Sequence, residues 1–139
     1  MRPARRPAPA VPLEELHVPS RITPCPDDSQ KCVSTLNTSG YPAFEPVPYT
    51  CTADEAMAAV EAVVADFPRT KVTSREPGYL ATTFTTLVFR FTDTVEFELD
   101  DEAKVVHFRS ESVPYAGSDL GANRKRMTAV RAALVERLG

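Results

Sequence analysis

The sequence has no tryptophan, five glycines and two histidines among its 139 residues. With so little glycine, it lacks both a loop that cradles phosphates and a glycine-flanked turn that exposes a nucleophile. The two histidines, His17 and His107, are too scattered to complete a metal site with the cysteines, whose spacing is not typical of zinc. We therefore expect no metal and no cofactor.

Long apolar runs are also missing. No run approaches the ~20 residues that a membrane span needs, and residues 1–10 lack the apolar middle of a signal peptide. The sequence as given predicts a soluble chain, cytoplasmic by default; an envelope location stays open if an export or anchoring segment was removed.

The net charge is −3, and no aromatic residue falls in the basic stretch 124–137. Nucleic-acid binders are more often basic with interleaved aromatics, so nucleic acid is not an expected partner.

The three cysteines form an odd count, so they cannot all pair within the chain. Cys25 and Cys32 are seven residues apart, a spacing that permits a disulfide in an oxidising compartment without requiring one. Buried free thiols, with Cys51 among them, are the alternative.

Proline divides the chain. Ten of the thirteen prolines precede Thr50, which excludes helix and central strand for most of the N-terminal third. We expect residues 1–23 to form a flexible Pro/Arg-rich arm and residues 24–139 to form a single domain. Within that domain, residues 25–51 are expected to be an extended ribbon that wraps the core.

Beyond the ribbon, helical and strand patterns follow one another. Thr52-Ala53-Asp54-Glu55 is a capping box, and apolar residues at helical spacing predict a helix over 53–67. Strands are expected over 70–76 and 79–91, the latter with a bend near Thr85-Thr86, followed by a two-stranded hairpin and a closing helix. This order predicts an α+β fold: two layers, a mainly antiparallel sheet with both helices packed on one face, and a Pro-rich extended N-terminal segment.

The hairpin is predicted to turn at residues 100–103. Aligning its apolar positions gives two cross-strand pairs on the core face, Phe97 with Val106 and Val95 with Phe108. This register places Glu96 opposite His107 and brings Asp93 close to Ser110. We therefore assign structural roles to Asp93, Glu96 and His107.

The closing helix carries an amide on its buried side. One stripe, about 100° wide, holds Leu120, Asn123, Met127, Val130, Leu134 and Leu138. The amide needs partners, because an unpaired buried amide costs on the order of 1–3 kcal/mol. We expect these partners at the end of the preceding strand and in the turn that follows it. Ser118 is the expected N-cap. Three cations at 124–126 follow near the positive end of the helix dipole, so an anion is expected to offset them: either a carboxylate of the protein or an anionic ligand.

These polar side chains define a candidate ligand site made of Arg109, Ser110, Ser112, Asp119, Asn123, Arg124 and Arg126. The first hypothesis is a non-catalytic accessory or binding domain that holds a small polar or anionic ligand there or serves the cell envelope. A second is a hydrolase that uses Ser110 or Ser112 with His107 and Asp93. Against it, His107 and Ser110 are three apart on a strand and point to opposite faces. A third is a protein-interaction domain whose polar cluster only stabilises the fold. No catalytic residue is assigned.

Four stretches are similar to the motifs of one family. They are residues 25–34, with a Cys-Pro…Asn-Cys-Val-Ser signature in which Lys31 replaces Asn; 91–97, an Asp-containing strand; 109–112, an Arg-Ser-x-Ser element; and 118–126, the most specific. On these motifs, residues 24–138 resemble the bacterial and plastid domain-of-unknown-function family numbered 1499. The chain departs from the family at 113–117, where a cation is more usual. The resemblance implies no catalytic residue, and members often carry export, lipoprotein or membrane segments, of which this sequence shows none.

Overall fold

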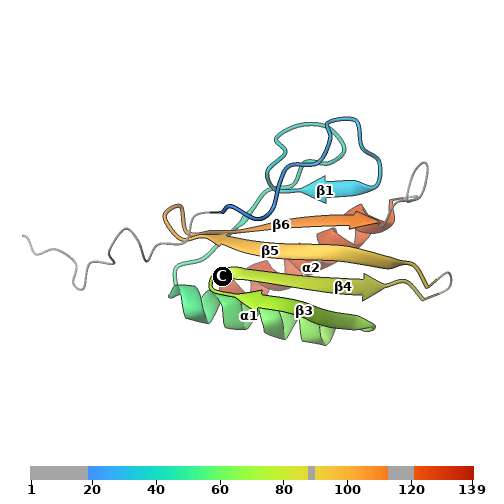
Figure 1. Ribbon diagram of the computed structural model, residues 1–139. Coiled ribbons are helices and arrows are strands. Elements are labelled where there is room, and N and C mark those ends of the chain that lie inside the picture. Colours follow the sequence, from blue (N-terminus) through green and yellow to red (C-terminus); the bar gives the residue numbers. More distant parts are fainter. Residues whose placement is uncertain (1–18, 88–89, 113–120) are drawn as a thin grey trace, which may run out of the picture.

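The computed structural model of the chain describes residues 19–87, 90–112 and 121–139. They form an α+β domain in which helices α1 and α2 pack on one face of an antiparallel sheet (Figure 1), as the sequence predicts. In chain order the elements are β1 Cys32–Ser34, β2 Val47–Pro48, α1 Ala53–Asp66, β3 Thr70–Glu76, β4 Tyr79–Thr85, β5 Thr92–Asp100, β6 Val105–Ser112 and α2 Ala122–Leu138. Within these ranges, neither helix combines the length and the apolar character that crossing a bilayer demands.

The sheet is built around the β5–β6 hairpin. Its strand order is β1-β6-β5-β4-β3, and every neighbouring pair is antiparallel. The proline-rich ribbon contributes two short strands to the free edge of β6. β1 pairs with Arg109 to Glu111, and β2 pairs with Val105 and Val106. The ribbon therefore joins the sheet only at its edge, where proline is tolerated.

The capping box starts α1 as expected. Thr52 Oγ1 accepts a hydrogen bond from the Glu55 N–H, and Glu55 Oε1 accepts one from the Thr52 N–H, both at 3.1 Å. The helix ends at Asp66, one residue before the predicted end. One core joins the two helices to the inner side of the sheet, and its buried side chains include Val33, Val60, Val63, Leu80, Val95, Phe97, Leu99, Phe108, Met127, Val130 and Leu134.

The β5–β6 hairpin differs from the predicted register. Phe97 lies opposite Phe108 rather than Val106. The turn occupies residues 101–104, one residue later than the predicted 100–103, and Asp100 Oδ1 at its start accepts the N–H groups of Glu102 and Ala103. This displacement moves each cross-strand partner by two residues. A shift of two residues leaves every side chain on its own face of the sheet. The apolar positions therefore still point to the core, and only the cross-strand partners change.

The cross-strand pairs that depended on the predicted register are wrong. The predicted pairs of Val95 with Phe108 and of Glu96 with His107 do not form. The residues that lie opposite each other are Val95 and Ser110, Glu96 and Arg109, Glu98 and His107, and Asp93 and Ser112.

The closing helix, α2, begins later than expected. Its N-terminal cap is Gly121, whose φ of 82° is a left-handed conformation that glycine adopts without steric cost. The predicted cap, Ser118, lies outside the described residues, as do Asp119 and Leu120. The rest of the predicted stripe is confirmed, and its buried members are Asn123, Met127, Val130 and Leu134.

The chain that precedes β1 lies on the sheet face that the helices leave open; we call residues 19–25 the strap. Ser20, Arg21 and Ile22 each donate a backbone N–H to the Glu98 carboxylate, at 3.2, 3.0 and 3.1 Å, and Glu98 is completely buried. Figure 1 shows this segment in blue beside β6. Residues 20–22, which the sequence placed in the arm, are thus held on the sheet.

Candidate functional site

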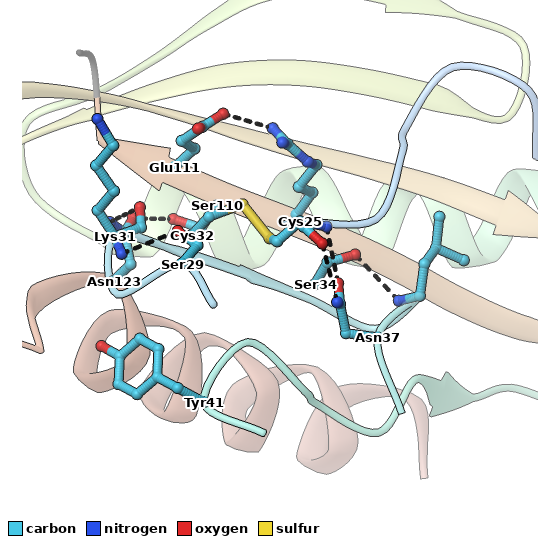
Figure 2. Close-up of a disulfide and its surroundings, with 12 residues drawn as sticks. Cys25, Ser29, Lys31, Cys32, Ser34, Asn37, Tyr41, Ser110, Glu111 and Asn123 are labelled. Atoms are coloured by element: carbon cyan, nitrogen blue, oxygen red, sulfur yellow. Dashed lines mark hydrogen bonds and ion pairs between the residues drawn. A yellow bond between two sulfur atoms is a disulfide. The ribbon is translucent and has the colours of Figure 1, made fainter. Parts of the chain in front are cut away.

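Asn123 is completely buried and points from α2 toward the end of β6. Its Oδ1 accepts hydrogen bonds from Ser110 Oγ at 2.5 Å and from Arg126 Nη1 at 2.8 Å. Its Nδ2 donates to Ser112 Oγ at 2.8 Å and to the carbonyl of Lys31 at 3.0 Å. Figure 2 shows Asn123, Lys31 and Ser110 gathered beside β1. The prediction of an inward amide whose partners lie at the end of the preceding strand is confirmed.

Arg126 is paired with a buried carboxylate. Its Nη2 lies 2.6 Å from Asp93 Oδ2, and the two side chains are 11% and 2% exposed. The guanidinium carbon lies 5.5 Å from the centroid of the Phe84 ring. Oδ1 of Asp93 is buried and has no hydrogen-bond partner among the residues that the structure describes. The anion that offsets Arg126 is therefore a carboxylate of the protein. We call Asp93, Ser110, Ser112, Asn123 and Arg126 the buried network.

Arg109 does not belong to the buried network. It lies on the opposite face of β6 from Ser110, because successive residues of a strand alternate between faces. Its Nη1 contacts Glu111 Oε1 at 2.8 Å, and its Nε is buried without a hydrogen-bond partner in the described part of the chain. The predicted site is thus brought together only in part: Ser110, Ser112, Asn123 and Arg126 converge, Arg109 and Arg124 lie elsewhere, and Asp119 is outside the described residues.

His107 has a structural contact, with a different partner from the predicted Glu96. Its Nδ1 lies 2.7 Å from the hydroxyl of Thr35, which follows β1. Burial lowers the pKa of His107 and outweighs the carboxylates of Asp100 and Glu98, which raise it. The imidazole is therefore favoured in its neutral form, and it joins the ribbon to the outer face of the sheet.

Cys25 and Cys32 form a disulfide, whereas Cys51 is a half-buried free thiol. Asn37 holds the same segment from the other side: its Oδ1 accepts the Cys25 N–H at 2.8 Å, and its Nδ2 donates to the Cys25 carbonyl at 3.0 Å. Figure 2 shows this arrangement, with the disulfide between Asn37 and the residues around Lys31. The strap is thus anchored to β1 by a covalent bond at its C-terminal end.

The arrangement of the serines argues against the hydrolase hypothesis. Ser110 is completely buried and Ser112 is 8% exposed. Both hydroxyls are hydrogen-bonded to Asn123. His107 lies on the other face of β6, out of reach of Ser110. Asp93 is bound to Arg126 rather than to an imidazole. These residues therefore do not assemble into a nucleophile–base pair.

An open groove lies between α2 and the ribbon. Its volume is about 730 Å³, within the range of roughly 300–1,000 Å³ typical of small-molecule sites. α2 contributes Arg124, Thr128 and Arg131, which are four and three residues apart and so share one helix face. The lining residues are Thr35, Asn37, Thr38, Ala43, Phe44, Glu45, Pro46, Arg124, Thr128, Arg131 and Ala132.

Two arginines hold the ribbon against this helix face. Arg124 Nη1 donates to the carbonyls of Tyr41 and Ala43, at 2.6 and 3.1 Å, and its guanidinium carbon lies 4.4 Å from the centroid of the Phe44 ring. Arg131 contacts the next two residues of the ribbon: its Nε donates to the Glu45 carbonyl at 2.7 Å and its Nη2 to the Pro46 carbonyl at 3.1 Å. Within the described ranges, Nε and Nη2 of Arg124 and Nη1 of Arg131 have no acceptor.

Sequence reasoning missed Arg131 and Glu98. A signal for Arg131 existed, since it lies seven residues after Arg124 and therefore on the same helix face. No comparable signal existed for Glu98. It alternates with apolar residues just as Glu96 does, and only the strap that covers it makes it buried.

Fold and site together define a small α+β domain with a closed polar network under α2 and an open groove on its flank. The described residues contain no group of three or more histidine, cysteine or acidic side chains that could hold a metal ion. Residues 21–134 match the family described as "Protein of unknown function (DUF1499)", and the chain belongs to that family. No curated protein matches the chain.

Proposed function

We propose that this domain is a non-catalytic binding module, and that its ligand is a small anionic molecule with an apolar body, held in the groove between α2 and the ribbon. The observation that carries the proposal is the pair of guanidinium groups, Arg124 and Arg131, which line the groove and whose bonds to the ribbon leave N–H donors without an acceptor among the described residues. Guanidinium groups are the side chains best suited to bind carboxylates and phosphates.

The chemistry of the lining supports this class of ligand. Two cations face a single carboxylate, Glu45, so the local charge favours an anion. Phe44, Pro46 and Ala132 offer apolar contact beside the hydroxyl groups of the lining threonines. Binding sites of this kind are mostly apolar with a few convergent polar groups. The buried network has a different role in the proposal: it positions α2, and so Arg124 and Arg131, against the ribbon.

The test is an NMR titration of the full chain with phenyl phosphate, inorganic phosphate and phenol. Phenyl phosphate is expected to shift the amide signals of Thr38, Thr128 and Ala132 and to bind more tightly than either half-molecule, because only it supplies both the anion and the apolar body. If none of the three probes shifts these signals at millimolar concentration, the proposal is wrong.

A matched pair of variants locates the site. Ala132 and Ala129 are both exposed on α2, but only Ala132 lines the groove. Ala132→Glu places a carboxylate beside the arginines and is expected to weaken phenyl phosphate binding roughly tenfold or more, in line with the cost of a like charge at close range. Ala129→Glu adds the same charge and helix propensity and should bind as the wild type does. Equal affinities in the two variants would place any binding outside the groove.

A further inference from the structure

One wall of the groove is positioned by the side chain of Asn37. Asn37 lines the groove and is 6% exposed. Its amide bonds both backbone groups of Cys25: Oδ1 accepts the N–H at 2.8 Å, and Nδ2 donates to the carbonyl at 3.0 Å. Thr38, the next residue, also lines the groove. Two hydrogen bonds from one planar amide fix the distance and the orientation of two backbone segments, so the position of this wall depends on the position of Cys25.

The neighbouring parts of the ribbon are attached to other elements. Before this segment, Thr35 exchanges two hydrogen bonds with the Phe108 backbone of β6, each 3.0 Å long. After it, Arg124 of α2 bonds the ribbon carbonyls. Residues 36–40 lie between these two attachments, and the bonds of Asn37 join them to the strap. A displacement of the end of the strap therefore reaches the groove through Asn37.

The disulfide attaches that end of the strap to the sheet. Cys32 belongs to β1, where it lies opposite Glu111 of β6, and Cys25 and Cys32 are 4% and 0% exposed. Figure 2 shows the disulfide next to the hydrogen bonds between Cys25 and Asn37. A continuous series of bonds thus leads from the sheet, through the disulfide and Asn37, to the groove wall. When the sulfurs are separate, the link from Cys25 to β1 is a stretch of irregular chain.

We propose that oxidation of Cys25 and Cys32 completes the groove, so that the domain binds its anion in an oxidising compartment and the reduced chain binds it less tightly. This inference rests on the proposed function and adds the condition under which that site works. In the oxidised chain the wall is ordered before the ligand arrives. In the reduced chain the ligand must itself order residues 36–40 and the end of the strap, and this loss of conformational freedom lowers the affinity.

The oxidation is a thiol–disulfide exchange with a disulfide oxidant. The thiolate of one cysteine attacks a sulfur of the oxidant and releases its first thiol. The thiolate of the other cysteine then attacks the protein sulfur of the mixed disulfide, which forms the Cys25–Cys32 bond and releases the second thiol. Two electrons and two protons pass from the protein thiols to the oxidant. Because both cysteines are buried in the product, a reductant reaches the bridge only after local opening. The oxidation is therefore a step of maturation, and the completed groove is retained.

The test is an NMR titration with phenyl phosphate of the full chain in two states, oxidised and reduced with dithiothreitol. The oxidised chain is expected to bind about fivefold more tightly or better, which is the lower end of the usual range for coupling between two sites. Without ligand, the amides of Asn37 and Thr38 should exchange with solvent faster in the reduced chain. Retained protection of the Phe97 amide, in the core, checks that the reduced chain is folded.

Three variants separate the disulfide from other effects of the reductant. Cys25→Ser combined with Cys32→Ser should bind as the reduced chain does, with no reductant present. Cys51→Ser keeps the bridge and removes the free thiol, so it should bind as the wild type does in both states. Asn37→Ala keeps the bridge and removes the two bonds to Cys25, so reduction should no longer change its affinity.

The outcomes distinguish this inference from the proposed function. Equal affinities of the oxidised and the reduced wild type would overturn the inference and leave the proposed function standing. Absence of binding in both states would overturn the proposed function and the inference together. Unchanged exchange at Asn37 and Thr38 on reduction would overturn the link between the disulfide and the groove wall, and so would an equal effect of reduction on Asn37→Ala and on the wild type.

Discussion

Two carboxylates of the same strand, β5, are buried on opposite faces of the sheet and are stabilised in different ways. Asp93, on the helix side, is paired with Arg126 of α2, and its other oxygen accepts no hydrogen bond from any described residue. Glu98, on the outer face, accepts three consecutive backbone N–H groups of the strap. Asp93 is stabilised by another buried charge, whereas Glu98 is stabilised by backbone dipoles.

The difference has a consequence for how each region can be disrupted. The ion pair depends on two side chains, so one substitution leaves a buried charge without its partner. The Glu98 arrangement depends on the path of the backbone, which the Cys25–Cys32 disulfide and Asn37 hold in place. We therefore expect the helix side to be destabilised by loss of a charge and the outer face to be destabilised by release of the strap.

The largest effect is expected from Arg126→Met, which leaves Asp93 buried and unpaired. It should lower the free energy of unfolding by about 3–5 kcal/mol, measured by urea denaturation. Arg137→Met is the matched control, because its ion pair with Asp66 is exposed and worth about 0–1 kcal/mol. A double variant, Arg126→Met with Asp93→Asn, should cost less than the sum of the two single changes. Equal losses for Arg126→Met and Arg137→Met would contradict this account.

Glu98→Gln is expected to cost about 2–3 kcal/mol, because an amide accepts the three N–H groups less well than a carboxylate. The amides of residues 20–22 should then exchange with solvent faster, as measured by hydrogen exchange. Glu96→Gln serves as the control: Glu96 lies on the same face and accepts the Tyr79 hydroxyl at 2.6 Å. If Glu98→Gln leaves the exchange of residues 20–22 unchanged, the carboxylate does not hold the strap.

Replacing Cys25 and Cys32 by serine is expected to cost about 2 kcal/mol, the value for a loop with a sequence separation of 7. The strap should become more accessible to exchange, while the amide protons near Asn123 keep their protection. Cys51→Ser removes the free thiol and should leave the strap unaffected. Loss of protection near Asn123 of the same size would show that the two faces of the sheet are not independent.

The smallest effect is expected from pH. Because burial lowers the pKa of His107 below its ordinary value of 6.5, the unfolded chain binds more protons than the folded one below that value. The contribution of His107 to stability is therefore complete above pH 6.5 and is lost as the pH falls through the folded pKa. Urea midpoints measured from pH 7.5 down to pH 5.5 should decline less steeply in His107→Gln than in the wild type, with His17 present in both. A parallel decline would exclude His107 as the cause.

Local signals in the sequence predicted most of the fold. The capping box at Thr52 placed the start of α1, and the helical spacing around Met127 placed the buried side of α2. The sequence also predicted that Asn123 would need partners at the end of β6, because a buried amide must be hydrogen-bonded. The sequence analysis also placed Arg109 in the same site. In the structure Arg109 lies on the other face of β6, because side chains alternate along the strand.

The sequence by itself determined the α+β class, the antiparallel hairpin, the faces of its strands and the inward amide of α2, because each follows from spacing within one element. Only the tertiary structure decided the hairpin register, the pairing of Asp93 with Arg126, the burial of Glu98 and the groove between α2 and the ribbon. Each of these depends on atoms brought together from distant parts of the chain, or on the position of a turn that begins at the hydrogen bonds of one side chain, Asp100. The spacing of residues along the sequence predicts neither the contacts between distant parts of the chain nor the hydrogen bonds of this turn.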